Sequence, residues 1–417
     1  MRRVLWFLLG ILTVALTGAV TVLPRAVDAS MNRVDRPDAP PVPSDSARAL
    51  HARLRIADLH DDLLLWSLRD PLTAHSRGQT DVPRLLAGNV AVQVFSTVSK
   101  TPRGLNYERN DASTDNVTLL AMTQRWPIAT WTSLYARAVR AARALDDAAA
   151  RSDDQLRVVR TREELDAGLA ARVAGTPLLL GVLSLEGMQV LEGRLDRVDS
   201  LFALGFRMGG LTHFFDNEVG GSAHGVTRGG LTPLGRQVIA RMEALGMLVD
   251  VAHASPALID DVLAIATRPV VVSHTGVAAT CPGPRNLTDE QLRRIAATGG
   301  VVGIGYWDGA VCEITPASVA RAIAHAVAVA GEDHVALGSD WDGAVVTSFD
   351  ASELVQVTDA LIGAGLTPSV IAKVMGENVL RLLSHTLPAH TLPSQTLPAH
   401  TLPAHTLPSS DGDTTRH

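Results

Sequence analysis

Cysteine is scarce in this chain of 417 residues, which contains only Cys281 and Cys312. Two cysteines can form neither a disulfide framework nor a cysteine-based zinc knuckle. A single disulfide between them is chemically open, but the sequence does not place the two side chains together. We therefore expect two buried free thiols.

A strong charge of one sign is also lacking, because the net charge is -6 and only 19% of the residues are charged. A nucleic-acid partner would call for a basic surface that neutralises phosphates, so we expect none. Hydrophobic residues make up 46% of the chain, which is ample for one large core.

One long apolar run stands at the N-terminus. Arg2 and Arg3 precede 20 uncharged residues, Val4 to Leu23, which as a helix would match the roughly 30 Å hydrocarbon core of a membrane. The flanking arginines favour a cytoplasmic N-terminus, which puts the rest of the chain outside. Val27-Asp28-Ala29 could also serve as a signal-cleavage site. Residues 1–29 are therefore expected to be either a membrane anchor facing the extracytoplasmic side or a cleaved signal that leaves a secreted protein.

Residues 30–48 read as a linker rich in proline and aspartate, and residues 49–384 as one globular domain. In that domain short apolar runs alternate with amphipathic helices, which is typical of parallel α/β architecture. Four helices are expected to begin at a hydroxyl residue followed by proline, as at Thr232-Pro233 and Ser255-Pro256. Eight strands predict a (β/α)₈ barrel. They are expected at Arg55–Leu59, Ala91–Ser96, Leu178–Leu185, Phe206–Leu211, Leu248–Val251, Val270–Ser273, Val301–Gly305 and Val335–Gly338.

Two segments depart from this alternation. A long insertion, about Thr101 to Thr176, separates the second and third predicted strands, and a helical stretch from Thr114 to Ala150 could cover part of the barrel mouth. Residues 385–417 repeat His-Thr-Leu-Pro with a period of five up to Pro408. Proline at that spacing forbids a helix, so we expect an extended, disordered tail.

Four histidines, His60, His213, His253 and His274, lie within two residues of the ends of predicted strands. Because the carboxyl ends of parallel strands meet at one face of a barrel, all four are expected on that face. Side chains alternate along a strand, so His60 and Asp62 should point the same way and reach one cation.

Glu186 directly follows a buried apolar run, where a carboxylate is costly unless it is paired or bound to a metal. Its two oxygens could bridge two ions about 3.5 to 4 Å apart. One ion would then be held by His60, Asp62 and Glu186, and the other by Glu186, His253 and His274. Nitrogen and oxygen ligands without a thiolate favour two Zn²⁺, with manganese or cobalt as substitutes.

Three further residues are expected to act on the substrate. Asp340 follows the last strand in Gly338-Ser339-Asp340 and is placed to act as general base on a metal-bound water. His213 is assigned to the oxygen that becomes negative in a tetrahedral intermediate. Arg285 offers a bidentate fork for a substrate carboxylate.

Together these residues resemble the membrane dipeptidase (renal dipeptidase) family of metallopeptidases. The resemblance spans about 55–383 and is carried by ADLHDDLL, DVPRLLAGNVAVQVFS, LEGMQVL, LTH, GLTPLGRQVIARMEALGMLVDVAHAS, VVVSHTGVAATCPGPRN, GSDWDG and MGENVLRLL. It implies an amidohydrolase-type barrel with a binuclear zinc centre, which hydrolyses dipeptides and tolerates a D-residue on the carboxyl side. It also places the bridging glutamate at Glu186, the other metal ligands at His60, Asp62, His253 and His274, the substrate residues at His213, Arg285 and Tyr306, and the catalytic aspartate at Asp340.

The resemblance is loose after His213, where FFDNEVGGSAHG leaves the side-chain preference open. The expected function is hydrolysis of dipeptides by a metal-bridging hydroxide. The nearest alternative is another amidohydrolase-type reaction, on N-acyl amino acids or lactones, since the same barrel and metals would serve it. A further alternative is a membrane-tethered binding protein without catalysis. The chain could form a homodimer, and the N-terminal helix would be its contact with the membrane.

Overall fold

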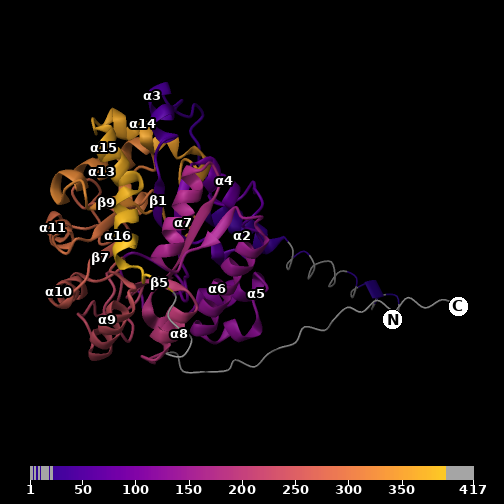
Figure 1. The fold of residues 1–417 in the computed structure, drawn as a ribbon. Coiled ribbons are helices and arrows are strands. Elements are labelled where there is room, and N and C mark those ends of the chain that lie inside the picture. Colours follow the sequence, from indigo (N-terminus) through magenta and orange to yellow (C-terminus); the bar gives the residue numbers. More distant parts are fainter. Residues whose placement is uncertain (1–2, 4–5, 8–9, 11–17, 19–21, 391–417) are drawn as a thin grey trace.

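The computed structural model describes residues 3, 6–7, 10, 18 and 22–390, and at its centre eight parallel strands close into a barrel. Figure 1 shows the strands surrounded by helices. The ring runs β1, β2, β4, β5, β6, β7, β8, β9, and the β2–β4 and β9–β1 pairings close it. The strands are β1 (Ile56–Asp61), β2 (Val90–Phe95), β4 (Leu179–Glu186), β5 (Phe206–Gly210), β6 (Leu248–Asp250), β7 (Val270–Thr275), β8 (Val301–Ile304) and β9 (Val335–Leu337). The predicted (β/α)₈ barrel is confirmed, and each predicted strand overlaps an observed one.

The strands are buried along their whole length, as expected where helices cover the outside of a parallel barrel and side chains fill its interior. The helices around it begin where the sequence predicts, since Thr232 and Ser255 each accept a hydrogen bond from the backbone N–H of the third helical residue. These helices are α4 (Val82–Ala87), α7 (Arg162–Val173), α8 (Arg197–Ala203), α9 (Pro233–Leu245), α10 (Pro256–Ile265), α11 (Asp289–Ala297), α12 (Asp308–Val311), α13 (Pro316–Ala330), α14 (Val355–Gly363), α15 (Pro368–Ala372) and α16 (Asn378–Thr386).

The long insertion differs from the single helical stretch that the sequence suggests. It contains α5 (Asn116–Thr123), a short 3₁₀ helix (Ile128–Trp131), α6 (Leu134–Arg151) and an additional strand, β3 (Leu156–Val158), which pairs with β4 outside the closed ring. The helix is interrupted because Arg125 adopts a positive φ and Pro127 has no backbone N–H to donate.

The segment before the barrel also differs from the expected signal or anchor and linker. Helices α2 (Leu23–Met31) and α3 (Asp45–His51) form there, and Asp28, Asn32 and His51 are buried against the barrel. The predicted membrane-spanning run lies largely outside the described residues. Within the described part of the chain, no helix combines the length and apolar character that crossing a membrane requires.

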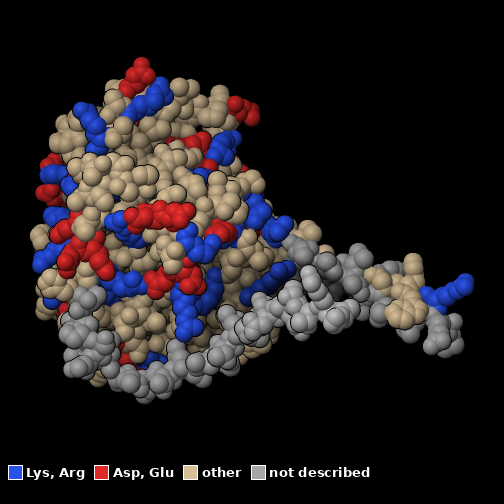
Figure 2. Space-filling view, turned by 45° about the vertical axis from the view of Figure 1, so that its right-hand side comes forward, with Lys and Arg blue, Asp and Glu red and all other residues tan. Residues whose placement is uncertain are grey.

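At the other end, the ordered chain continues a few residues past the predicted boundary, because α16 ends at Thr386 and Leu387 is buried. The backbone N–H of Arg162 donates to the carbonyl oxygen of Pro388. Most of the predicted tail, residues 391–417, lies outside the described residues. Figure 2 shows basic and acidic side chains interspersed over one face of the molecule. Elsewhere in the described chain, ion pairs such as Arg241–Asp199 join neighbouring helices, here α9 and α8.

The expectation of two free thiols is wrong, because Cys281 and Cys312 form a disulfide with their Cα atoms 5.5 Å apart. Cys281 lies in the loop after β7 and Cys312 directly follows α12, after β8. The two positions are 31 residues apart, and only the adjacency of β7 and β8 in the ring brings them together.

Candidate metal centre

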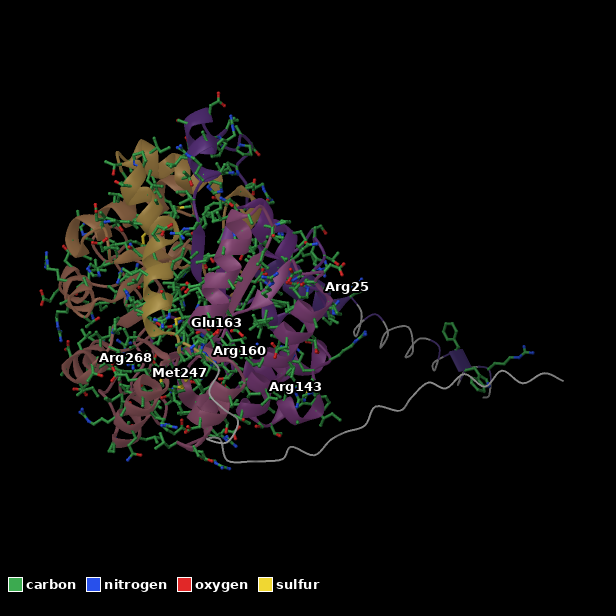
Figure 3. The ribbon with its side chains drawn as sticks, viewed as in Figure 1. Arg25, Arg143, Arg160, Glu163, Met247 and Arg268 are labelled. Atoms are coloured by element: carbon green, nitrogen blue, oxygen red, sulfur yellow. A yellow bond between two sulfur atoms is a disulfide. The ribbon has the colours of Figure 1, made fainter. Side chains whose placement is uncertain are left out.

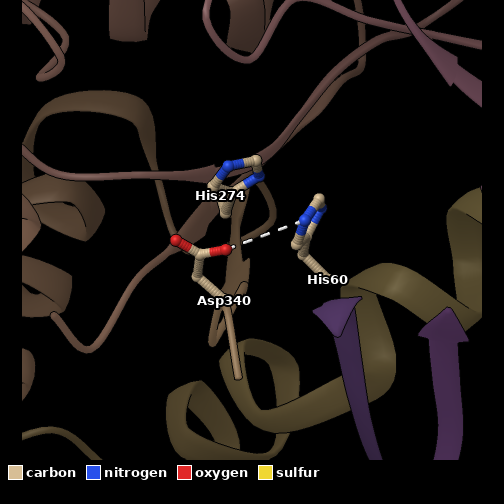
Figure 4. A group of neighbouring side chains, drawn as sticks. All are labelled: His60, His274 and Asp340. Carbon is tan, nitrogen blue, oxygen red and sulfur yellow. Dashed lines mark ion pairs between the residues drawn. The ribbon is translucent and has the colours of Figure 1, made fainter. Parts of the chain in front are cut away.

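Six ionisable side chains converge at the carboxyl ends of the strands. His60 and His274 lie on β1 and β7, Glu186 is the last residue of β4, and His253 follows β6. Asp62 and Asp340 follow β1 and β9. Figure 4 shows His60, His274 and Asp340 pointing toward one another from different strands. The structure therefore brings together the five residues predicted as metal ligands and the predicted general base, on the face where such barrels carry their chemistry.

Glu186 is at the centre of this cluster. Its Oε1 lies 3.0 Å from Nε2 of His253 and 3.3 Å from Nε2 of His274. The same oxygen is 3.7 Å from Nε2 of His60, which in turn lies 3.3 Å from Oδ2 of Asp62. One carboxylate thus faces imidazoles from three other strands, which is the arrangement that a bridging ligand requires.

Several side-chain atoms in the cluster make no hydrogen bond inside the protein. Both ring nitrogens of His60, Nδ1 of His253 and Oδ1 of Asp62 are buried without a hydrogen bond. Buried polar atoms are almost always paired, so this concentration points to a group that the protein binds. Three sets of side chains have ligand atoms within 4.8 Å of one another and could each hold an ion: His60, Asp62 and Glu186; His60, His274 and Asp340; and Glu186, His213 and His253.

The charges of the cluster also fit a cation. Burial raises the pKa of Glu186 well above its usual value, and burial raises that of Asp340 to about 7. Burial alone would lower the pKa of His60, but Asp62 and Glu186 outweigh it and raise the pKa to about 10. The three buried carboxylates, Asp62, Glu186 and Asp340, have few positively charged groups near them. Divalent cations would allow all three to remain ionised.

His274 is oriented by two residues to which the sequence analysis gave no role. Its Nδ1 lies 2.9 Å from Oγ of Ser273, and that hydroxyl donates to Oδ2 of Asp250 at 2.6 Å. Because the hydroxyl proton is directed to Asp250, Nδ1 of His274 is the donor and Nε2 keeps its lone pair for a cation. In the sequence, the only indication of this pair is that a serine and an aspartate stand at the ends of neighbouring strands.

The β1 side is held by Asp58, the first aspartate of the ADLHDDLL motif. It is fully buried and accepts hydrogen bonds from the backbone N–H of His60, the side chain of Gln93 and both the N–H and the hydroxyl of Ser339. Ser339 precedes Asp340, so Asp58 links the backbone of a candidate ligand to that of the candidate base.

Two residues of the cluster have backbone conformations that are uncommon for side chains with a Cβ. His253 and Asp340 both have φ of 62°. Such backbone conformations cost free energy. They persist where the surrounding structure holds a side chain in a required direction. Here the side chain of His253 is directed toward Glu186 and that of Asp340 toward His60.

His213 lies beside the cluster, with Nε2 3.4 Å from Oε2 of Glu186. Its Nδ1 is 3.3 Å from the carbonyl oxygen of Lys100, so the ring proton belongs on Nδ1. Burial lowers the pKa of His213 to about 3 and disfavours a second proton. Nε2 is therefore an acceptor or a ligand, and the geometry does not favour the predicted donation to an oxyanion.

Arg285 is buried near these histidines, and its Nη2 donates to the carbonyl oxygen of His274 at 2.6 Å. Its Nε has no partner, and in the described part of the chain no ion pair joins it to a carboxylate. A buried guanidinium without an anion is costly, which favours the predicted role in binding one.

A cavity of about 450 Å³ opens above the cluster and is lined by His213, Arg285 and Asp340 together with Tyr107 and Trp307. Nε1 of Trp307 donates to the hydroxyl of Tyr107 at 2.9 Å. Tyr306, predicted as a substrate residue, does not line this cavity. It is fully buried and packs against Trp341 and Phe349. Side chains alternate in direction after β8, so the neighbouring Trp307 reaches the cavity instead.

The family model described as Membrane dipeptidase (Peptidase family M19) matches residues 44–394, which is most of the chain. The chain belongs to the membrane dipeptidase family. The barrel and the cluster at its carboxyl face are therefore those of a metallopeptidase family. Membership implies a metal cofactor, and the residues described above fit one.

This member of the membrane dipeptidase family is moderately similar in sequence to several known proteins. An uncharacterized protein from the pqqA 5' region of Klebsiella pneumoniae is 34% identical over 241 residues, which cover 54% of this chain and 89% of that protein. Dipeptidase verJ of Clonostachys rogersoniana is 32% identical over 241 residues, covering 56% of this chain and 61% of verJ. A metallo peptidase from Rhodobacter sphaeroides, solved with a phosphinate mimic of the dipeptide L-Ala-D-Ala, has a TM-score of 0.63, 25% identity, and coverage of 80% of this chain and 99% of that one.

Proposed function

We propose that this protein is a metal-dependent dipeptidase that cleaves dipeptides, including those with a carboxyl-terminal D-residue. The observation that carries the proposal is the position of Glu186 among imidazoles from three other strands, with an unpaired Arg285 on the same cavity. Family membership supports peptide hydrolysis, and the structural relative with a mimic of L-Ala-D-Ala supports the D-residue.

Two divalent cations, most simply Zn²⁺, would be held by the sets predicted from the sequence. His60, Asp62 and Glu186 would hold one, and Glu186, His253 and His274 the other. Nitrogen and oxygen donors without thiolate suit zinc. When bound, such cations lower the pKa of water toward neutrality and polarise a carbonyl group.

The residues of the chain would then position the substrate and move protons. Asp340 would take the proton of the attacking water and pass it to the leaving amine, as a carboxylate that bound cations keep ionised can do. Arg285 binds the free carboxylate of the substrate through its unpaired guanidinium edge. His213 contacts the substrate as an acceptor through Nε2, in keeping with its ring proton on Nδ1.

A requirement for a free carboxylate one residue from the scissile bond would make the enzyme a dipeptidase. The test compares Ala-D-Ala, Ala-L-Ala, a tripeptide, N-acetyl-D-alanine and a lactone at equal metal loading, before and after chelation. We expect metal-dependent turnover of the two dipeptides and none of the tripeptide. Preferred turnover of the N-acyl amino acid or the lactone would replace the proposal by the other amidohydrolase reaction. Binding without any turnover at full metal loading would indicate a binding protein.

We also propose that the barrel acts outside the cytoplasm, either tethered by residues 4–23 or secreted. The apolar run after two arginines supports this, as does the Cys281–Cys312 disulfide, because such bonds persist mainly in oxidising compartments. Cell fractionation with thiol alkylation tests the proposal. A reduced cysteine pair on protein recovered from the cytoplasm would contradict it.

A further inference from the structure

Helix α2 lies across one side of the candidate substrate cavity. Pro24, Val27 and Met31 line the same cavity as Glu186 and Asp340, and their spacing puts them on one face of the helix. Arg25 is exposed on the outer side of α2, at the surface of the molecule (Figure 3). This short helix, just before the barrel, thus contributes an apolar wall close to the proposed reaction centre.

The wall is fixed to the barrel by buried ion pairs. Oδ2 of Asp28 lies 3.1 Å from Nε of Arg69 and 3.3 Å from Nε of Arg77. Arg69 also pairs with Asp342 at 2.9 Å. Asp28 is only 2% exposed, and in such surroundings breaking a paired charge is strongly destabilising. The helix is therefore held as a fixed part of the mouth.

A second contact joins α2 to the loop that carries Asp340. Nδ2 of Asn32, directly after the helix, donates to Oδ1 of Asp28 at 3.0 Å, and its Oδ1 accepts from the backbone N–H of Ala344 at the same distance. Ala344 and Val345 of that loop line the cavity beside α2.

The rest of this wall comes from the segment after β2. Val98 and Leu105 line the cavity there, as do Val117, Leu119 and Leu120 of α5. In the closed ring β2 is four strands away from β7 in either direction. Arg285, in the loop after β7, and the α5 part of this wall therefore follow strands on opposite sides of the ring, and both line the cavity.

From this arrangement we propose that α2 and α5 form an outer subsite that binds a large apolar side chain on the amino-terminal residue of the substrate. The inference rests on the proposed dipeptidase function. If Arg285 holds the carboxylate and the scissile bond lies over Glu186, the amino-terminal residue extends toward α2 and α5. Burial of an apolar side chain there stabilises the complex by about 25 cal/mol per Å² of surface removed from water. This favours substrates beginning with leucine or phenylalanine over those beginning with alanine.

The first test uses two added charges on the same helix of the full chain. Val27→Glu places a carboxylate in the wall, and Ala29→Glu places one on the exposed face as the matched control. The readout is the ratio of kcat/KM for Phe-D-Ala to kcat/KM for Ala-D-Ala. Val27→Glu should lower this ratio about tenfold, and Ala29→Glu should leave it at the wild-type value.

An unchanged ratio in Val27→Glu would overturn the inference, as would an equal fall in Ala29→Glu. Met31→Gln keeps the side-chain length and removes only apolar character, so it gives the same test should Val27→Glu fail to fold. Failure of the proposed function is distinguishable, because the wild-type chain would then hydrolyse neither dipeptide.

The second test concerns the N-terminus of the active protein. Cleavage after Ala29 would remove Pro24, Val27 and Asp28, and with them the part of the wall that α2 contributes. Mass spectrometry of active enzyme isolated from its host should find an N-terminus ahead of Pro24. Active enzyme that begins at Ser30 and keeps the preference for Phe-D-Ala would overturn the inference.

Discussion

The position of Glu186 fits a carboxylate that binds a cation. It is buried, and its oxygens face four imidazoles at 3.0 to 3.7 Å. An isolated carboxylate in such a place would be protonated, because burial raises its pKa. A cation at this position would keep Glu186 ionised and use its two oxygens.

Glu186→Gln should abolish dipeptide turnover and metal retention, since an amide cannot supply two anionic oxygens to a pair of ions. Metal analysis of the purified variant and its kcat for Ala-D-Ala measure both effects. Glu218→Gln is the matched control, because Glu218 is exposed on the loop after β5. Full turnover in the Glu186 variant would show that the bridging role is wrong.

Arg285→Ala should mainly raise KM for dipeptides, because the substrate carboxylate loses a charge-assisted contact worth roughly 2 kcal/mol or more, about thirtyfold. Arg285→Lys should recover only part of this loss, since an ammonium cannot form the bidentate contact. Steady-state kinetics separate KM from kcat. A fall in kcat with KM unchanged would instead assign Arg285 to the reaction itself.

The individual ligands could be predicted because strand ends are visible in the sequence, and histidine or a carboxylate directly after an apolar run is unusual. The roles of Asp250 and Ser273 could not, because they depend on which strands are neighbours. The prediction that Tyr306 faces the cavity failed for a local reason. Side chains alternate in direction after β8, so a shift of one residue decides whether Tyr306 or Trp307 faces the cavity, and the apolar run does not determine that register.

At the scale of elements, helix starts were predictable because a hydroxyl and a proline act locally. The short strand β3 was not, since three residues carry too little pattern, and neither was the docking of α2. That docking depends on Asp28 meeting Arg69, 41 positions further along the chain. The end of the segment expected as a signal or anchor therefore packs against the barrel.

Helix α3 shows how this region is coupled to the barrel. Nδ1 of His51 lies 2.8 Å from Oγ1 of Thr358 on α14, and Nε2 is 3.1 Å from the carbonyl oxygen of Gly88. Burial lowers the pKa of His51 below its usual 6.5. The folded chain thus keeps His51 neutral at a pH where the unfolded chain takes up a proton.

The contribution of His51 to the free energy of unfolding should therefore be present above pH 6.5 and be lost as the pH falls below it. His51→Gln should be less stable than wild type at pH 8 and should lose less stability between pH 8 and pH 5.5. Urea denaturation at both pH values measures this difference. His385→Gln, at an exposed histidine, should follow the wild-type pH dependence. An identical loss in the wild type and His51→Gln would contradict the prediction.

At the scale of the whole molecule, the sequence predicted the barrel because eight apolar runs alternate with helices. It did not predict what closure of the ring brings together. The disulfide joins loops after adjacent strands, and the cavity combines residues from α2, α5 and most of the strand ends. Such contacts are set by the closed order of the strands, which local patterns do not contain.

The same closure makes the metal centre a determinant of global stability. Its proposed ligands come from four strands, β1, β4, β6 and β7, or the residues just after them, so cation binding requires the closed ring. A ligand that binds only the folded chain contributes about 4 kcal/mol when its free concentration is a thousand times its Kd. Chelation should therefore lower the Tm by roughly 5 to 10 °C, given the usual scaling for large domains.

Calorimetry with and without chelator measures the change, and readdition of Zn²⁺ should reverse it. Glu186→Gln should show a much smaller shift, because its site no longer holds the ions. An unchanged Tm in wild-type protein whose metal has been verifiably removed would mean that the ring closes without help from cations, and the strands would then hold three buried carboxylates together on their own.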